Sequence, residues 1–97
     1  MVIVGGAFTV NPAERDAFIA SRIEGMELSR AEPGCLEYVM AADPIDPGRV
    51  VLFERWESQE ALDTHLAVQR PAPPAGSPAP TGASIKIYDI AGERTLA

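Results

Sequence analysis

His65 and Trp56 are the side chains in this sequence whose types most directly suggest chemistry, and they lie nine positions apart in ERWESQEALDTHL, residues 54 to 66. Each is the only residue of its type in the chain. An imidazole with its ordinary pKa of about 6.5 accepts a proton near neutral pH, which makes His65 the first candidate for a general base. A tryptophan forms the floor of a pocket by stacking and donates its indole N–H. The structural alternative is a core histidine with one satisfied hydrogen bond beside a large core aromatic residue.

Glu54 and Tyr38 are the next candidates for chemistry. Glu54 shares a strand face with Leu52 and Trp56, because side chains alternate along a strand. On a covered face, its carboxylate either pairs with an arginine such as Arg22 or is a second proton acceptor with a raised pKa. Tyr38 either brings its hydroxyl to a substrate oxygen or is an aromatic residue of a dimer face with a solvated tip.

Other reactive residue types give weaker signals. Cys35 has no neighbouring histidine or second cysteine, so we interpret it as a small buried hydrophobic residue and exclude it as a nucleophile. One histidine and scattered carboxylates do not form a metal-ligand set, so we expect no metal. The Gly5-Gly6 pair lacks the spacing of a phosphate-binding loop and indicates a close approach by a helix or a partner strand.

The first half of the chain predicts a strand, a helix and a second strand. Residues 2 to 10 are β-branched and aromatic around the glycine pair, as in a strand. Asn11 supplies an N-cap and Glu14 the position of a capping box, so we expect one helix that continues to Ala31 and stops at EPG, residues 32 to 34. The expected buried face of this helix comprises Phe18, Ile19, Ile23 and Met26.

The second half predicts a hairpin, a shorter helix and a last strand. Residues 35 to 42 and 49 to 57 are the expected hairpin strands. Ser58 caps a helix that we expect to end near Arg70, with an inner face of Ala61, Leu62, His65 and Leu66. Residues 71 to 83 form a proline-rich connector, and residues 84 to 90 the last strand.

The order of these elements is β-α-β-β-α-β, which predicts one α+β, ferredoxin-like domain over residues 1 to 97 with a four-stranded antiparallel sheet. With both helices on one face, the other face presents residues such as Val51, Phe53 and either Leu36 or Tyr38 to water. We therefore expect a homodimer in which two such sheets pack face to face.

The overall composition excludes several partners. The formal net charge is −6 over 97 residues, which disfavours nucleic acid and anionic membrane surfaces. No apolar stretch approaches the length of about 20 residues that crosses a bilayer. The start of the chain lacks the features of a signal peptide, and the single cysteine cannot form an internal disulfide, so we expect a cytoplasmic protein.

Three stretches of the chain resemble one known family. EPGCLEYVM (32 to 40), VVLFERWESQEALDTHL (50 to 66) and IKIYDI (85 to 90) are similar to the antibiotic biosynthesis monooxygenases, also called quinol monooxygenase-like proteins. The resemblance implies a dimeric α+β barrel with a cavity between the sheet and the helices of each subunit. It also implies oxidation of a small aromatic quinol or anthrone by O2 without a cofactor.

The resemblance also implies roles for individual residues. His65 aligns with a histidine that these proteins tend to carry and is the expected base, with Trp56 and Tyr38 as the other catalytic candidates. The expected substrate-binding residues are Phe18, Leu52, Glu54 and Leu62. Where many members continue the second helix into HLASPHF, this chain has HLAVQRPAPP. Relatives that degrade haem, with His65 as an axial ligand, and relatives that bind a small ligand without turnover are the alternative functions.

Overall fold

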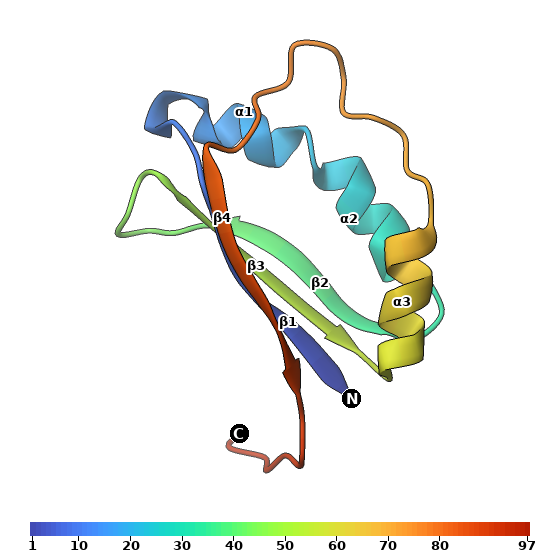
Figure 1. Cartoon of the computed structure of the whole chain (residues 1–97). Helices are drawn as coiled ribbons and strands as arrows, with labels where there is room; N and C mark the ends of the chain where they lie inside the picture. The colour runs from blue at the N-terminus through green and yellow to red at the C-terminus, as the bar shows by residue number, and fades with distance from the viewer.

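A four-stranded antiparallel sheet carries the helices on one of its faces in the computed structural model, which describes residues 1–97 (Figure 1). The strands pair in the order β2-β3-β1-β4, and all neighbours are antiparallel. The elements in chain order are β1 (Val2–Thr9), the 3-10 turn η1 (Pro12–Glu14), α1 (Arg15–Ala20), α2 (Ile23–Arg30), β2 (Cys35–Ala42), β3 (Arg49–Trp56), α3 (Gln59–Ala67) and β4 (Gly82–Asp89). The architecture is α+β and ferredoxin-like, which confirms the predicted fold class. None of the helices is long and apolar enough to cross a membrane.

The alternation of β3 determines which side chains face the helices. Val50, Leu52, Glu54 and Trp56 are buried on the covered face, while the residues between them point the other way and are partly exposed. Tyr38 pairs with Glu54 across β2 and β3, so it also faces the helices. The sequence predicted that either Leu36 or Tyr38 lies on the open face of the sheet. Tyr38 does not, whereas Leu36, at an irregularity in β2, is 39% exposed.

The helix predicted from Pro12 to Ala31 is wrong as a continuous element, because it breaks at Ser21 and Arg22. The Ser21 hydroxyl donates to the Phe18 carbonyl at 2.6 Å, and the Arg22 N–H bonds to the Ile19 carbonyl three residues back. This local hydrogen bonding tightens the turn and ends α1. The break redirects α2, so Ile23, expected on the buried face, is 48% exposed.

Two of the three predicted capping residues, Asn11 and Ser58, cap a helix or turn, and the third, Glu14, does not. The Asn11 side chain accepts the Ala13 N–H at 3.0 Å, but Glu14 is exposed and closes no capping box. The Ser58 hydroxyl accepts the Ala61 N–H at 3.1 Å and starts α3 as expected. The helix ends at Ala67, before the predicted end near Arg70.

The inner face of α3 is narrower than predicted. Leu62 and His65 are buried, whereas Leu66 is 66% exposed because it lies outside the face that packs on β3. From Val68 the chain runs without a helix or strand beside α2 and returns to the start of β4 (Figure 1). Gly6 allows β4 to pair closely with β1, since a Cβ on Gly6 would lie only 2.0 Å from the Ser84 carbonyl oxygen.

The core lies between the helices and the covered face of the sheet, in two clusters. The first consists of Val2, Val4, Leu52, Trp56 and Leu62, and the second of Val10, Phe18 and Val50. The helices pack mainly on β2 and β3. This arrangement places the Trp56 end of β3 under α3, where the candidate residues meet.

Candidate functional site

His65 and Trp56 lie in direct contact. The Ser58 cap turns the chain from the end of β3 into α3, and two helical turns later His65 returns over the indole. The ring centroids are 4.6 Å apart at an angle of 37°. The Tyr38 ring approaches the same imidazole from β2, with centroids 5.6 Å apart. The imidazole of α3 therefore contacts two aromatic rings, one from β2 and one from β3.

Glu54 lies beneath this group and makes no ion pair with an arginine. The residue is 5% exposed, and its carboxylate accepts the Trp56 indole N–H at 3.0 Å. Nε2 of His65 is 3.9 Å from the same oxygen. Burial raises the pKa of the Glu54 carboxyl above its ordinary range, and the Trp56 N–H offsets part of that rise.

Glu32 and Arg70 complete the surroundings of the imidazole, and neither was among the predicted site residues. Oε2 of Glu32 is 2.6 Å from Nδ1 of His65, and Arg70 forms an ion pair with the other Glu32 oxygen. Nη2 of Arg70 is itself 2.7 Å from Nδ1. Glu32 heads the EPGCLEYVM stretch, which is the one sequence signal that pointed to it.

The turn that carries Glu32 packs against α3. Gly34 has φ of 83°, and a Cβ there would lie 2.6 Å from the Ala61 Cβ, so only glycine allows this approach. The Glu57 N–H also donates to the Gly34 carbonyl at 2.8 Å. These contacts hold the Glu32 carboxylate beside Nδ1 of His65.

The imidazole can adopt either neutral tautomer in this environment. When Nδ1 donates to Glu32, Nε2 has a free lone pair and is a proton acceptor. When Nδ1 instead accepts from Arg70, Nε2 carries the proton and points it towards Glu54. A carboxylate oxygen lies 2.6 Å from Nδ1 and another lies 3.9 Å from Nε2, while Nη2 of Arg70 shares the Nδ1 side.

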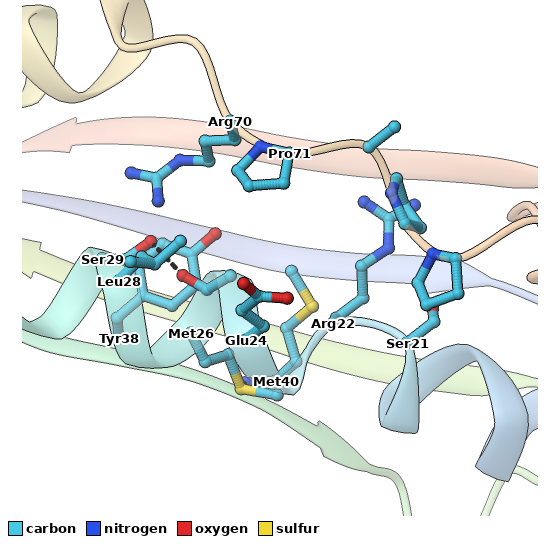
Figure 2. Close-up of a pocket in the computed structure, with 14 residues that line it drawn as sticks. Ser21, Arg22, Glu24, Met26, Leu28, Ser29, Tyr38, Met40, Arg70 and Pro71 are labelled. Atoms are coloured by element: carbon cyan, nitrogen blue, oxygen red, sulfur yellow. Dashed lines mark hydrogen bonds between the residues drawn. The ribbon is translucent and has the colours of Figure 1, made fainter.

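A cavity of about 140 Å³ adjoins this group, between α2, β2 and the start of the connector (Figure 2). Its lining comprises Ser21, Arg22, Glu24, Gly25, Met26, Leu28, Ser29, Tyr38, Met40 and residues 70–74. Arg70 and the four residues after it form the wall that faces α2. In HLAVQRPAPP, the residues from Arg70 onwards thus form one wall of the cavity, although they lie in an irregular segment and not in a longer helix.

Of the seven predicted site residues, only Tyr38 lines this cavity. Burial, and next the Glu54 carboxylate, raise the pKa of the Tyr38 phenol, so it remains a hydrogen-bond donor at neutral pH. Glu54, Trp56 and His65 lie behind it. Leu52 and Leu62 pack with Trp56 in the core, and Phe18 belongs to the second cluster, beneath Arg22.

Cys35 is partly buried, at the start of β2 beside Trp56. Burial raises the pKa of its thiol, and its Sγ lies 3.6 Å from the Glu37 carbonyl oxygen. A protonated thiol is a poor nucleophile. No set of three or more His, Cys, Asp or Glu side chains gathers in the chain as a metal site would require.

The fold and the sequence of this chain match known proteins. The family model for antibiotic biosynthesis monooxygenases matches residues 1–69. An uncharacterised protein of Synechocystis sp. is 33% identical over 98% of this chain and 67% of its own length. The chain therefore belongs to the antibiotic biosynthesis monooxygenase family.

Solved structures agree with this assignment. A Deinococcus radiodurans protein assigned to the same family superposes with a TM-score of 0.82 over 100% of this chain and 99% of its own, at 23% identity. A Mycobacterium tuberculosis protein gives a TM-score of 0.75 at 27% identity, over 97% of this chain and 98% of its own. A Chloroflexus aurantiacus protein, also assigned to the family, gives 0.72 at 28% identity, over 99% and 98% of the two chains.

Proposed function

We propose that this chain is a homodimeric, cofactor-independent monooxygenase that oxidises a small aromatic quinol or an anthrone-type substrate with O2. The observation that carries the proposal is His65, whose imidazole lies between the carboxylates of Glu32 and Glu54 and contacts Trp56. Tyr38 links this group to the cavity, because it contacts His65 and also lines the cavity wall. Family membership supports the class of reaction.

The proposed reaction begins with proton transfer to His65. The imidazole takes the proton of a phenol or enol, and the two carboxylates stabilise the imidazolium that forms. The electron-rich substrate anion then reduces O2, and a carbon peroxide results. For an anthrone, the methylene becomes a carbonyl that keeps one atom of O2, and the other atom leaves as water with the two methylene hydrogens. For a quinol, one oxygen atom enters the ring, the other leaves as water, and the ring becomes a hydroxyquinone.

Access to His65 requires the Arg70 side chain to move. Arg70 lines the cavity and also contacts both Glu32 and Nδ1 of His65, so it stands between the cavity and the imidazole. Movement of Arg70 with residues 71–74 would join the cavity to the base. This step assigns the connector a role in admitting substrate.

Dimerisation through the open face of the sheet is the second part of the proposal. The register places Val39 beside Phe53 and Ala7 beside Val51 on that face, and no helix of the chain covers them. Tyr88 extends the apolar surface onto β4, opposite Ile3. Burial of this surface against a second copy would form the α+β barrel.

An oxygen electrode tests the proposed reaction. We expect the native protein, in buffer treated with a chelator, to accelerate O2 uptake from at least one compound in a panel of one-ring hydroquinones, naphthoquinols and anthrones. His65→Ala should lower kcat by about 100-fold, the usual contribution of a positioned base. Leu66→Ala, at an exposed neighbouring position of α3, is the matched control and should leave kcat unchanged. Uptake at the non-enzymatic rate with every compound would contradict the proposal.

Binding without turnover is the second candidate function, and the packing of the site favours it in one respect. His65 is only 8% exposed and Trp56 is fully buried, so neither lines the cavity. Ligand-induced thermal stabilisation without O2 uptake would support this alternative. Haem degradation has less support, because the cavity beside this group measures about 140 Å³, and a cavity of about 150 Å³ accommodates only a benzene-sized ring.

A further inference from the structure

Arg22 presents an unpaired positive charge to the cavity. Its Nε is buried without a hydrogen-bond partner, and the residue takes part in no ion pair. The guanidinium carbon lies 5.0 Å from the centre of the Phe18 ring, which holds the group in place from one side. Arg70, the other arginine of the cavity, is neutralised by Glu32. The terminal nitrogens of the guanidinium also form no hydrogen bond or ion pair, and because Arg22 is only partly buried and lines the cavity, they are the donors that an acceptor on a bound ligand would reach.

Arg22 and Tyr38 contribute different chemical groups to the cavity. Figure 2 shows the two side chains at opposite ends of the cavity, with Met26 and Met40 between them. Leu28 and Pro71 add further apolar wall. A ligand that spans the cavity therefore meets a cation at one end, an apolar middle and a hydroxyl donor at the other end.

The volume of the cavity limits the ligand to one ring. An apolar protein cavity of about 150 Å³ accommodates benzene. The cavity here measures about 140 Å³, which matches a single substituted ring and is too small for three fused rings.

We propose that the substrate of this site is a one-ring hydroquinone that carries a carboxylate, bound through a charge-assisted hydrogen bond to Arg22. This inference rests on the proposed oxidation of a quinol and specifies its substrate. The planar guanidinium matches a carboxylate in geometry. With the carboxylate at Arg22, the ring lies between Met26 and Met40, and a phenolic hydroxyl reaches Tyr38 on the side where His65 lies.

Glu24 is the one acidic side chain in the cavity lining, and it opposes the ligand. It lies on the first turn of α2, is exposed, and pairs with neither arginine of the cavity. Its charge repels a carboxylate in the cavity. Glu24→Gln should therefore tighten carboxylate binding, the opposite of the effect of removing Arg22.

Calorimetric titration with ligands that resist oxidation tests the inference apart from turnover. We expect the native protein to bind 4-hydroxybenzoate about tenfold more tightly than its neutral isostere 4-hydroxybenzamide, the usual difference for a charge-assisted hydrogen bond. Arg22→Gln should abolish this preference, and Arg22→Lys should keep part of it. Thermal melting should show both variants folded, because Arg22 has no hydrogen bond or ion pair to lose and only its contact with the Phe18 ring changes.

Three outcomes would overturn the inference. They are equal affinity of the native protein for the two ligands, an unchanged preference in folded Arg22→Gln, and tighter binding of phenyl phosphate than of 4-hydroxybenzoate. Measurements of oxygen uptake distinguish failure of this inference from failure of the proposed oxygenation. Uptake from uncharged quinols but not from 2,5-dihydroxybenzoate would overturn the inference and leave the oxygenation intact. Carboxylate-selective binding with no uptake from any quinol would overturn the oxygenation and leave the Arg22 subsite standing.

Discussion

At the scale of single residues, Glu32 is the side chain that most directly controls His65. Its carboxylate holds Nδ1 at 2.6 Å and neutralises Arg70 on the same site. Glu32→Gln removes the charge that favours the imidazolium and leaves Arg70 beside Nδ1 without a counter-charge. We expect kcat for O2 uptake to fall by about tenfold or more. Glu27→Gln, at an exposed position of α2, is the control, and an unchanged kcat in Glu32→Gln would show that Glu32 has no part in the reaction.

The buried carboxyl of Glu54 should make the free energy of unfolding depend on pH. Burial raises the pKa of this carboxyl, so the folded protein binds its proton more tightly than the unfolded chain does. The free energy of unfolding therefore contains a contribution that is complete at acid pH and declines as pH rises through the raised pKa. Glu54→Gln does not ionise and keeps an oxygen for the Trp56 N–H. Its stability relative to the native protein should increase from mildly acidic to mildly alkaline pH in urea unfolding.

The control for this measurement is Glu93→Gln, an exposed position near the C-terminus. We expect its stability relative to the native protein to stay constant over the same pH range. A constant difference for Glu54→Gln as well would mean that burial does not raise the pKa of Glu54.

At the scale of elements, the turn between α2 and β2 positions the Glu32 carboxylate against α3. Gly34 has a positive φ and touches Ala61, so Gly34→Ala should lower the free energy of unfolding by about 2 kcal/mol through backbone strain and the clash. Gly25→Ala is the matched comparison, since a Cβ there meets nothing within 4 Å. It should stabilise α2 by up to about 1 kcal/mol. Equal effects of the two substitutions in urea unfolding would contradict this account.

The elements also show how far sequence reasoning reaches. The alternation of β3 predicted that Glu54 and Trp56 lie on the covered face, and the Ser58 cap predicted that His65 lies on the inner face of α3, as the structure has them. The cavity that Trp56 and His65 were expected to border is lined by neither. The break at Ser21 and Arg22 depends on a hydroxyl-to-carbonyl bond, which competes with a helical pattern that the sequence otherwise supports. Glu32 reaches His65 from 33 residues away, through a turn that packs on α3. No periodicity predicts such a contact, and the role of Arg70 depends in the same way on the path of an irregular segment.

At the scale of the whole molecule, the open face of the sheet predicts the oligomeric state. Phe53 lies near the middle of that face, between Gly5 of β1 and Val39 of β2. A charge at this position would remain solvated in a monomer. In a dimer it would be buried, which costs free energy and therefore opposes dimerisation. We expect the native protein to have about twice the 10.3 kDa chain mass in light scattering, and Phe53→Glu to have the mass of one chain. Ile45→Glu, in the loop before β3, should leave the dimer intact, and a native mass of one chain would contradict the barrel.

Isotope labelling tests the central claim, that His65 starts a cofactor-free insertion of oxygen into an aromatic substrate. The native protein is supplied with ¹⁸O2 and a quinol in chelator-treated buffer, and the product is analysed by mass spectrometry beside that of His65→Ala. We predict one ¹⁸O atom in each product molecule formed by the native protein, and product from His65→Ala at about one hundredth of the native rate. A product whose new oxygen comes from water, or equal labelled product from both proteins, would contradict the claim.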